Sequence, residues 1–305
     1  MARDIHKFVK PYVIKDGKGF RLKDFSPGDR RSVTSDRQAK VRLAEGVERL
    51  TKLQEKLYAS DRWGVLLIFQ AMDTAGKDGS IKHVMSGVNP QGCEVYSFKA
   101  PSAEELDHDF LWRTSKALPE RGRIGIFNRS YYEETLVVRV HPDFLSRQKI
   151  PHELVTRHIW RERFQDINAF ERYLARNGYV IRKFFLNISR KEQKKRLLER
   201  LDIPAKNWKF SAGDLEERRH WDEYMDAYED MIRHTATRHA PWVVVPADDK
   251  KFAHIVVAAA VIDALESLNL AFPKVDARQR SELEAARQVL ERKDKRERNG
   301  KADKD

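Results

Sequence analysis

The stretch Gly76-Lys77-Asp78-Gly79 could bind phosphate. It follows an apolar run, residues 65–69, that predicts a buried strand, and residues 80–85 after it are compatible with a helix. Strand, glycine-lysine turn and helix form the layout of a phosphate-binding loop, in which backbone N–H groups and a helix N-terminus face the anion. Lys77 would neutralise phosphate oxygens there. The alternative is a surface lysine on a turn, which the buried strand and the two glycines make less favourable.

The loop departs from the usual pattern G-x-x-x-x-G-K-[ST]. Ala71 stands where the first glycine belongs, and Asp78 where the magnesium-binding hydroxyl belongs. Asp73 is a carboxylate in a loop meant for anions, which a bound divalent cation or an abstracted proton would explain. The alternative for Asp73 is an Asx turn or helix cap, and Asp78 suits the first turn of a helix.

Asn128 and Arg129 lie at the end of the third predicted strand, residues 123–128. In a parallel sheet the ligand lies beyond the carboxyl ends of the strands, so these residues can meet the loop. Arg129 could stabilise charge on a transferring phosphoryl group, while Asn128 would be a weak magnesium ligand. Glu133 lies one helical turn beyond Arg129, and a plain salt bridge between the two is its alternative reading.

A basic helix and an exposed loop form the third candidate, a lid over residues 190–220 that closes on phosphates and excludes water. The alternative is a solvated helix face, but Trp208 and Phe210 favour a structured lid. The predicted phosphate-binding residues in this lid and in the first loop are Ala75, Gly76, Lys77, Asp78, Gly79, Lys82, Arg196, Lys206, Lys209 and Arg218. Asp73, Lys77, Arg129 and Glu133 are the predicted catalytic residues, and Asp73 and Asn128 the predicted metal ligands.

Five apolar strands alternating with helices predict an α/β fold, a mainly parallel five-stranded sheet with helices on both faces. The strands are expected at residues 65–69, 93–98, 123–128, 179–188 and 241–246. Helices are expected at 35–58, 102–118, 151–177, 189–201, 214–239 and 250–270, with an exposed loop at 202–213. The expected organisation is an N-terminal arm (1–33), a core domain (34–272) and a charged C-terminal helix and tail (273–305).

The chain has 305 residues and a formal net charge of +12, of which residues 273–305 carry only 11 − 8 = +3. The folded body is therefore basic, which favours a polyanionic partner, although a basic protein without such a partner is not excluded. The single cysteine, Cys93, excludes an intrachain disulfide and suits a buried thiol better than a nucleophile. No apolar stretch predicts a signal peptide or a membrane span, so we expect a cytoplasmic protein.

Four blocks of this sequence resemble the family-2 polyphosphate kinases. They are residues 71–79, residues 127–133, the lid with Lys209-Phe210-Ser211 and Trp221, and Ala240-Pro241-Trp242. Their order and spacing match from about residue 5 to 272. The resemblance implies a three-layer P-loop kinase fold similar to thymidylate kinase, with a helical lid. It also implies transfer of phosphate between inorganic polyphosphate and a nucleotide, with Mg²⁺ as cofactor and Mn²⁺ as a possible substitute.

Many members of that family have Asp at the position of Asn128 and no Glu at that of Glu133. The pairing found here resembles the subgroup that accepts both AMP and ADP. The partners implied are polyphosphate and adenine, possibly guanine, nucleotides, with a homo-oligomer (dimer or tetramer) and neither membrane nor specific nucleic acid. Two other hypotheses remain: an NTP-dependent nucleotide kinase of similar fold, which the missing Ser/Thr after Lys77 disfavours, and a non-enzymatic nucleic-acid-binding protein, which leaves Asp73 unexplained.

Overall fold

The computed structural model describes residues 2–31, 33 and 35–302. The chain divides into two compact units, Met1–Leu270 and Ala271–Asp305. The first unit contains a sheet between two layers of helices, and the second contains the helix α14 (Ala277–Ala302).

Within the described residues, six strands form one sheet in the order β1-β6-β5-β2-β4-β3. Their bounds are β1 Val13–Ile14, β2 Gly64–Gln70, β3 Cys93–Ser97, β4 Ile124–Asn128, β5 Tyr179–Asn187 and β6 Trp242–Pro246. The five predicted strands are confirmed, and their pairings are all parallel. β1 was not predicted because two residues carry no alternation; it pairs antiparallel with β6 and attaches the N-terminal segment to the sheet.

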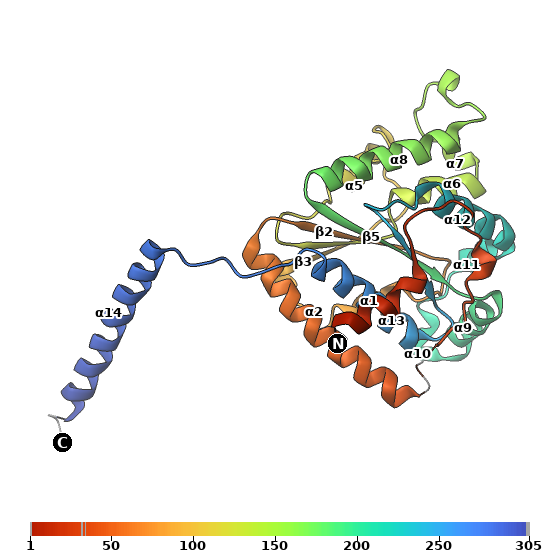
Figure 1. Cartoon of the computed structure of the whole chain (residues 1–305). Helices are drawn as coiled ribbons and strands as arrows, with labels where there is room; N and C mark the ends of the chain where they lie inside the picture. The colour runs from red at the N-terminus through yellow and green to blue at the C-terminus, as the bar shows by residue number, and fades with distance from the viewer. Residues whose placement is uncertain (1, 32, 34, 303–305) are drawn as a thin grey trace. The chain divides into compact units, whose positions relative to one another are not determined.

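Helices cover both faces of this sheet (Figure 1). The helices of the first unit are α1 (Ala2–Val9), α2 (Asp36–Ser60), α3 (Lys77–Val84), α4 (Ala103–Leu106), α5 (Trp112–Ser115), α6 (Val137–Val140), α7 (Asp143–Ser146), α8 (Ile159–Arg176), α9 (Arg190–Asp202), α10 (Pro204–Asn207), α11 (Ala212–Arg219), α12 (Trp221–Thr235) and α13 (Lys250–Glu266). Short 3₁₀ turns are η1 (Lys10–Tyr12), η2 (Leu22–Asp24), η3 (Pro90–Gly92), η4 (Tyr131–Thr135) and η5 (His152–Leu154). α1, α2 and α13 lie on one face of the sheet, and α5, α6, α8 and α12 on the other (Figure 1).

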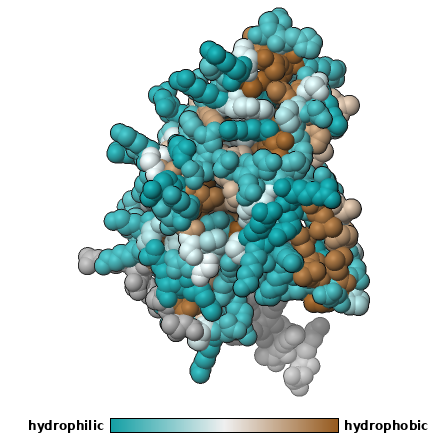
Figure 2. All heavy atoms as spheres, turned by 90° about the vertical axis from the view of Figure 1, so that its right-hand side faces the viewer, coloured by the Kyte–Doolittle hydropathy of each residue, from teal (hydrophilic) through white to brown (hydrophobic). Residues whose placement is uncertain are grey.

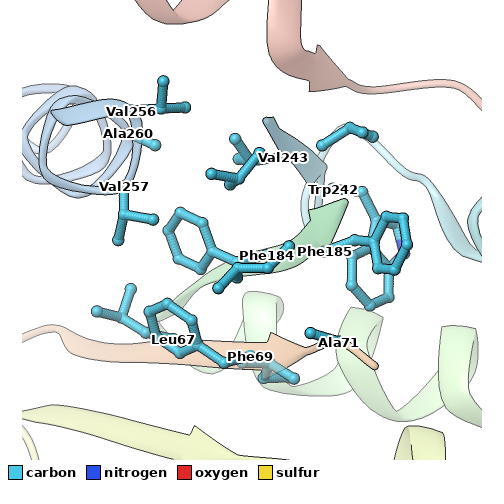
Figure 3. Packing of buried hydrophobic residues seen from close by; sticks show 14 of the residues in the cluster. Leu67, Phe69, Ala71, Phe184, Phe185, Trp242, Val243, Val256, Val257 and Ala260 are labelled. Atoms are coloured by element: carbon cyan, nitrogen blue, oxygen red, sulfur yellow. The ribbon is translucent and has the colours of Figure 1, made fainter. Parts of the chain in front are cut away.

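The central strands are apolar because neither face meets water. All seven residues of β2 and all five of β6 are buried. Phe69 of β2 stacks on Phe184 of β5, with ring centroids 4.7 Å apart, and Val257 of α13 lies beside them (Figure 3). Each fully buried side chain of this size contributes about 1.5–3 kcal/mol, so this layer fixes the position of every strand end.

Two predicted helices begin or end elsewhere. The helix expected over residues 102–118 starts with a capping box of Ser102 and Glu105 but stops at Leu106, because the Asp109 carboxylate accepts from the backbone N–H of Leu111 and forms a turn. The helix expected from residue 151 begins at Ile159. Residues before it form η5, and the Thr156 hydroxyl accepts from the backbone N–H of His158.

The lid also differs from the prediction. Residues 202–213 were expected to be a loop but contain α10, and the next helix begins after Ser211 rather than Asp214. Asp214 instead accepts a hydrogen bond from Arg200 of α9. The helix expected over residues 214–239 is broken at His220 into α11 and α12. The lid therefore consists of short helices with bends between them.

The second unit confirms the predicted helical piece. α14 is a 26-residue helix on which Leu283, Val289 and Leu290 are exposed. Across the described part of the chain, no helix has the length and apolar character needed to cross a bilayer.

Gly125 lies in the middle of β4, where a Cβ atom would come within 2.7 Å of Pro119 Cδ. Gly125→Ala should therefore lower the free energy of unfolding by about 1–3 kcal/mol, because Gly125 and Pro119 are both buried and the chain must shift to make room. Urea denaturation followed by circular dichroism measures the change. Gly28→Ala is the matched control, since its Cβ would meet nothing closer than 3.9 Å; equal stability losses in the two variants would contradict the packing argument.

Candidate active site

The loop after β2 forms a tight turn around the ammonium group of Lys77. Gly76 caps α3 with φ +106°, a left-handed conformation that suits glycine. Lys77 Nζ donates to the carbonyl of Ala71, 2.8 Å away, so the lysine folds back over the start of the loop. Burial, together with the nearby charge of Arg129, lowers the pKa of Lys77, while neighbouring carboxylates oppose the shift. A phosphate at this loop would supply the negative charge that the buried lysine needs.

Arg196 of α9 holds the loop from behind. It is almost fully buried, and its Nε donates to Glu192 at 2.9 Å. One terminal nitrogen donates to the carbonyls of Thr74 and Ala75, and the other to the carbonyls of Ala247 and Asp248, at 2.7–3.1 Å. These bonds account for all five N–H groups of the guanidinium. Its predicted contact with phosphate stays a prediction, and the structure gives it the task of shaping the loop.

A cavity of about 400 Å³ opens in front of the loop, and we call it the loop cavity. It is lined by residues 72–80 and by Asn128 and Arg129 from the neighbouring strand end. Its other walls come from α3, the lid and α13: His83, Arg196, Glu199, Arg200, Lys206, Lys209, Lys250, Ala253 and His254. The cations in this lining make the cavity suitable for a polyanion.

Arg129 joins the two predicted clusters. Its guanidinium lies 3.1 Å from Asp73 Oδ1 and 3.2 Å from Glu133 Oε2. The backbone of Arg129 is left-handed, with φ +66°, and Glu133, ahead of the other effects, raises the pKa of this guanidinium. Asn128 donates to Asp78 at 2.7 Å, so both strand ends meet, as the parallel sheet predicts.

A second cavity of about 240 Å³, the side cavity, lies beyond Arg129. Arg129 and Glu133 form one wall, and Phe98, Pro101, Val138 and Phe144 are among its apolar lining residues. Glu133 is held by Gln70: in the amide orientation that satisfies both ends of the glutamine, its nitrogen donates to Glu133 Oε1 at 2.7 Å. Arg129 lines both cavities, so one guanidinium lies between them.

Most of the predicted site residues line one of these cavities. Those at the loop cavity are Asp73, Ala75, Gly76, Lys77, Asp78, Gly79, Asn128, Arg129, Arg196, Lys206 and Lys209, and Glu133 lies at the side cavity. Lys206 pairs with Glu199 at 2.9 Å, and Lys209 lies over the exposed ring of Trp208. Lys82 and Arg218 are not in either lining. Arg218 donates to Gln193 at 2.6 Å, and Gln193 in turn donates to the Asp73 carbonyl.

Sequence reasoning did not assign Lys250, His83 or His254 to the site. Lys250 begins α13 directly after β6, so the argument from strand ends could have found it. The imidazoles of His83 and His254 stack at 4.6 Å beside Gly79, a contact between α3 and α13 that no local pattern predicts. Cys93 is half-buried, and burial raises the pKa of its thiol to about 12, which agrees with an inert thiol.

The residues present suit a magnesium ion that enters on phosphate. In the described part of the chain no three His, Cys, Asp or Glu side chains are grouped to hold a metal by themselves. Magnesium needs no such cage, because one or two carboxylates, waters and phosphate oxygens complete its shell. Asp73 and Asp78 lie on the cavity wall, and the buried hydroxyl of Thr74 has no hydrogen-bond partner among the described residues.

Comparison with known proteins gives a consistent picture. The family model described as Polyphosphate kinase 2 matches residues 33–273. An ADP-polyphosphate phosphotransferase of Rhodopseudomonas palustris is 57% identical over 249 residues, covering 81% of this chain and 86% of that protein. An AMP/ADP-polyphosphate phosphotransferase of Meiothermus ruber is 45% identical over 267 residues, covering 87% and 96%. The crystal structure of a polyphosphate kinase 2 from Arthrobacter aurescens superposes with a TM-score of 0.81 at 44% identity, covering 88% of this chain and 94% of that one.

His254 predicts a pH dependence of stability. Burial, then the charges of His83 and Lys250, lowers its pKa from 6.5 to about 4, so the unfolded chain binds a proton that the folded chain does not between these values. Stability should therefore fall as the pH drops from about 6.5 towards 4 and be fully present above 6.5. Each pKa unit is worth about 1.4 kcal/mol, so the loss is about 2–3 kcal/mol.

Urea denaturation at pH 7.5 and pH 4.5 tests this. His254→Asn should lose about 2 kcal/mol less than the wild-type chain over that interval, because Asn does not titrate. His152→Asn, at an exposed position, serves as the control and should behave like the wild type. Equal losses in the wild-type chain and His254→Asn would contradict the prediction.

Proposed function

Because this chain belongs to the polyphosphate kinase 2 family, we propose that it moves phosphate from inorganic polyphosphate to nucleoside mono- and diphosphates, AMP to ADP and ADP to ATP. One observation supports this most directly: Arg129 lies in the wall shared by two cavities. A transferring phosphoryl group needs a cation at the point where donor and acceptor meet.

The loop cavity is the proposed donor site. Its cations come from the loop, the lid and α13, so they surround a chain of phosphates rather than a single one. Figure 2 views the molecule from the side on which α9 to α12 lie in Figure 1, and this face is mainly hydrophilic. A net charge of +12 suits a polymer that carries a negative charge on every residue.

The side cavity is the proposed acceptor site. Phe98 and Phe144 give it an apolar wall for a base, and the guanidinium of Arg147 lies 4.9 Å from the Phe144 ring centroid. The cavity of about 240 Å³ has a mainly apolar exposed surface, with charged groups on part of its wall, and so fits a nucleotide better than a second stretch of polyphosphate. The terminal phosphate of the acceptor would then face Arg129 and Glu133.

Each residue of the site has a task in this scheme. Lys77 and the lid cations bind the donor, and Arg129 stabilises the charge that develops on the transferring group. Asp73 and Glu133 hold Arg129 from opposite sides before substrate enters. Asp73 with Asn128 would bind magnesium, which when present neutralises phosphate oxygens and aligns donor with acceptor. Closure of the lid excludes water and so prevents hydrolysis of the donor.

The same proposal covers the remaining expectations. Mn²⁺ would replace Mg²⁺ because both prefer oxygen ligands in octahedral geometry. We further propose a cytoplasmic homo-oligomer that uses adenine and also guanine nucleotides, with the organisation into arm, core domain with lid, and C-terminal tail described above. An NTP-dependent kinase of similar fold would work without polyphosphate, and a nucleic-acid-binding protein would show salt-dependent binding without turnover.

Lys77→Ala tests the donor loop. With polyphosphate, magnesium and ADP, the wild-type protein should produce ATP, and the variant should be slower by about 10²- to 10³-fold with an unchanged circular dichroism spectrum. Lys52→Ala is the control, because that lysine pairs with Glu48 on the surface of α2. Failure of folded wild-type protein to make product from either AMP or ADP would refute the function. Equal turnover by Lys77→Ala would refute only the loop assignment.

Glu133→Asn tests the choice of acceptor. The carboxylate lies at the side cavity and pairs with Arg129, so its loss should lower kcat/KM for AMP about tenfold more than for ADP. Side-by-side assays with the two acceptors at one polyphosphate concentration measure the ratio. If both acceptors lose the same factor, Glu133 has no part in selecting AMP.

A further inference from the structure

The turn η4 directly follows Arg129 and Ser130, carries Glu133 on one side and enters the protein core with the other. Tyr131, Tyr132 and Thr135 of this turn are fully buried. Both tyrosine hydroxyls donate to one oxygen of Glu171 on α8, at 3.0 Å from Tyr131 and 2.8 Å from Tyr132. The segment that forms the proposed phosphoryl-transfer point is therefore tied to a carboxylate deep in the core.

Glu171 is paired with an equally buried lysine. Lys183 of β5 donates to Glu171 Oε2 at 2.7 Å, to the Tyr132 hydroxyl at 2.9 Å and to the Thr235 carbonyl at 2.7 Å. Glu171 and Lys183 are both 0% exposed, and these bonds use all three N–H groups of the ammonium. A network that leaves no partner unmatched is rigid and has one geometry.

Stability alone does not account for an ion pair in this place. Taking two charges out of water costs about as much as their attraction returns, and well-packed apolar residues often replace such a pair without loss. The backbone at Arg129 and η4, however, needs contacts from other elements to keep its conformation. Arg129 has φ +66°, a conformation that a side chain other than glycine keeps only when its surroundings over-determine it.

We propose that Glu171 and Lys183 are positioning residues, which act through the hydroxyls of Tyr131 and Tyr132 to place Arg129 and Glu133 at the acceptor. A second buried pair supports the same turn: Arg163 of α8 donates to Glu134 at 2.6 Å. Both pairs use α8, so this helix is the frame on which η4 rests.

The inference rests on the proposed function and adds that η4 serves the acceptor site rather than the donor site. Glu133 lines only the side cavity of the two, whereas the donor is bound by the loop, the lid and α13. A displaced η4 should therefore weaken the acceptor site and leave the donor site intact. A purely structural role would instead reduce the amount of folded enzyme, which lowers kcat for both substrates and changes neither KM.

Tyr132→Phe removes one hydroxyl and is the primary variant. Steady-state kinetics should show a KM for ADP raised at least about fivefold and a KM for polyphosphate within about twofold of wild type. Tyr131→Phe loses only its bond to Glu171 and should show the same direction with a smaller change; it carries the test if Tyr132→Phe does not fold. Tyr179→Phe is the matched control, because its hydroxyl donates at 3.0 Å to the Pro119 carbonyl, away from both cavities.

The double variant Lys183→Met with Glu171→Gln separates the effect of two buried charges from the positioning of the Tyr132 hydroxyl. It removes both charges at nearly constant volume, so the chain should fold, yet the ADP KM should stay raised because the Tyr132 hydroxyl has lost its donor. An ADP KM equal to wild type in the folded variants, or equal rises for ADP and polyphosphate, would overturn the inference alone. A wild-type protein without phosphate transfer would overturn the proposed function as well.

Discussion

The guanidinium of Arg196 is the interaction on which the site depends. It joins three elements that are far apart in the sequence: the phosphate loop through Thr74 and Ala75, the end of β6 through Ala247 and Asp248, and its own helix through Glu192. The loop lacks the first glycine of the usual pattern, and Thr74 takes a left-handed conformation with φ +64°. Two charge-assisted hydrogen bonds from this buried side chain, to the carbonyls of Thr74 and Ala75, hold the loop in that conformation.

Arg129 differs from Arg196 in its partners, because carboxylates rather than backbone carbonyls hold it. Two carboxylates hold it before substrate is present, and each belongs to a different part of the site: Asp73 to the loop and Glu133 to the turn η4. The guanidinium is thus placed in advance, and we propose that entering phosphates replace these carboxylate oxygens without a large movement of the arginine. Asn128 contributes no charge, so the charge balance around Arg129 depends on Asp73 and Glu133. The combination of a neutral Asn128 with an acidic Glu133 is consistent with this local charge balance.

Much of the fold could be predicted because its signals are local. Apolar runs such as residues 65–69 have few alternatives to a buried strand, and the glycine-lysine turn predicts the edge of the sheet at which the loop cavity lies. The contacts that shape the site are not local. Lys183 reads as a polar residue in an apolar strand and Glu171 as a charged residue in a helix, and only folding brings them together. Helix ends were missed for a similar reason: the carboxylate of Asp109 and the bend at His220 oppose a continuous apolar periodicity.

The anchoring of α9 limits how the lid can move. Because Arg196 fastens this helix to the loop and to the segment after β6, a swing of α9 would have to break four hydrogen bonds at once. Residues 203–220 are in turn tied to α9, since Lys206 donates to Glu199, Asn207 to the carbonyls of Arg200 and Leu201, and Arg218 to Gln193. The short helix α10 and the residues after it, which carry Lys206 and Lys209, are therefore held beside the loop cavity without substrate. We propose that a polymer slides past these fixed cations by one phosphate at a time while the loop still binds it, as repeated transfers from a single bound chain require.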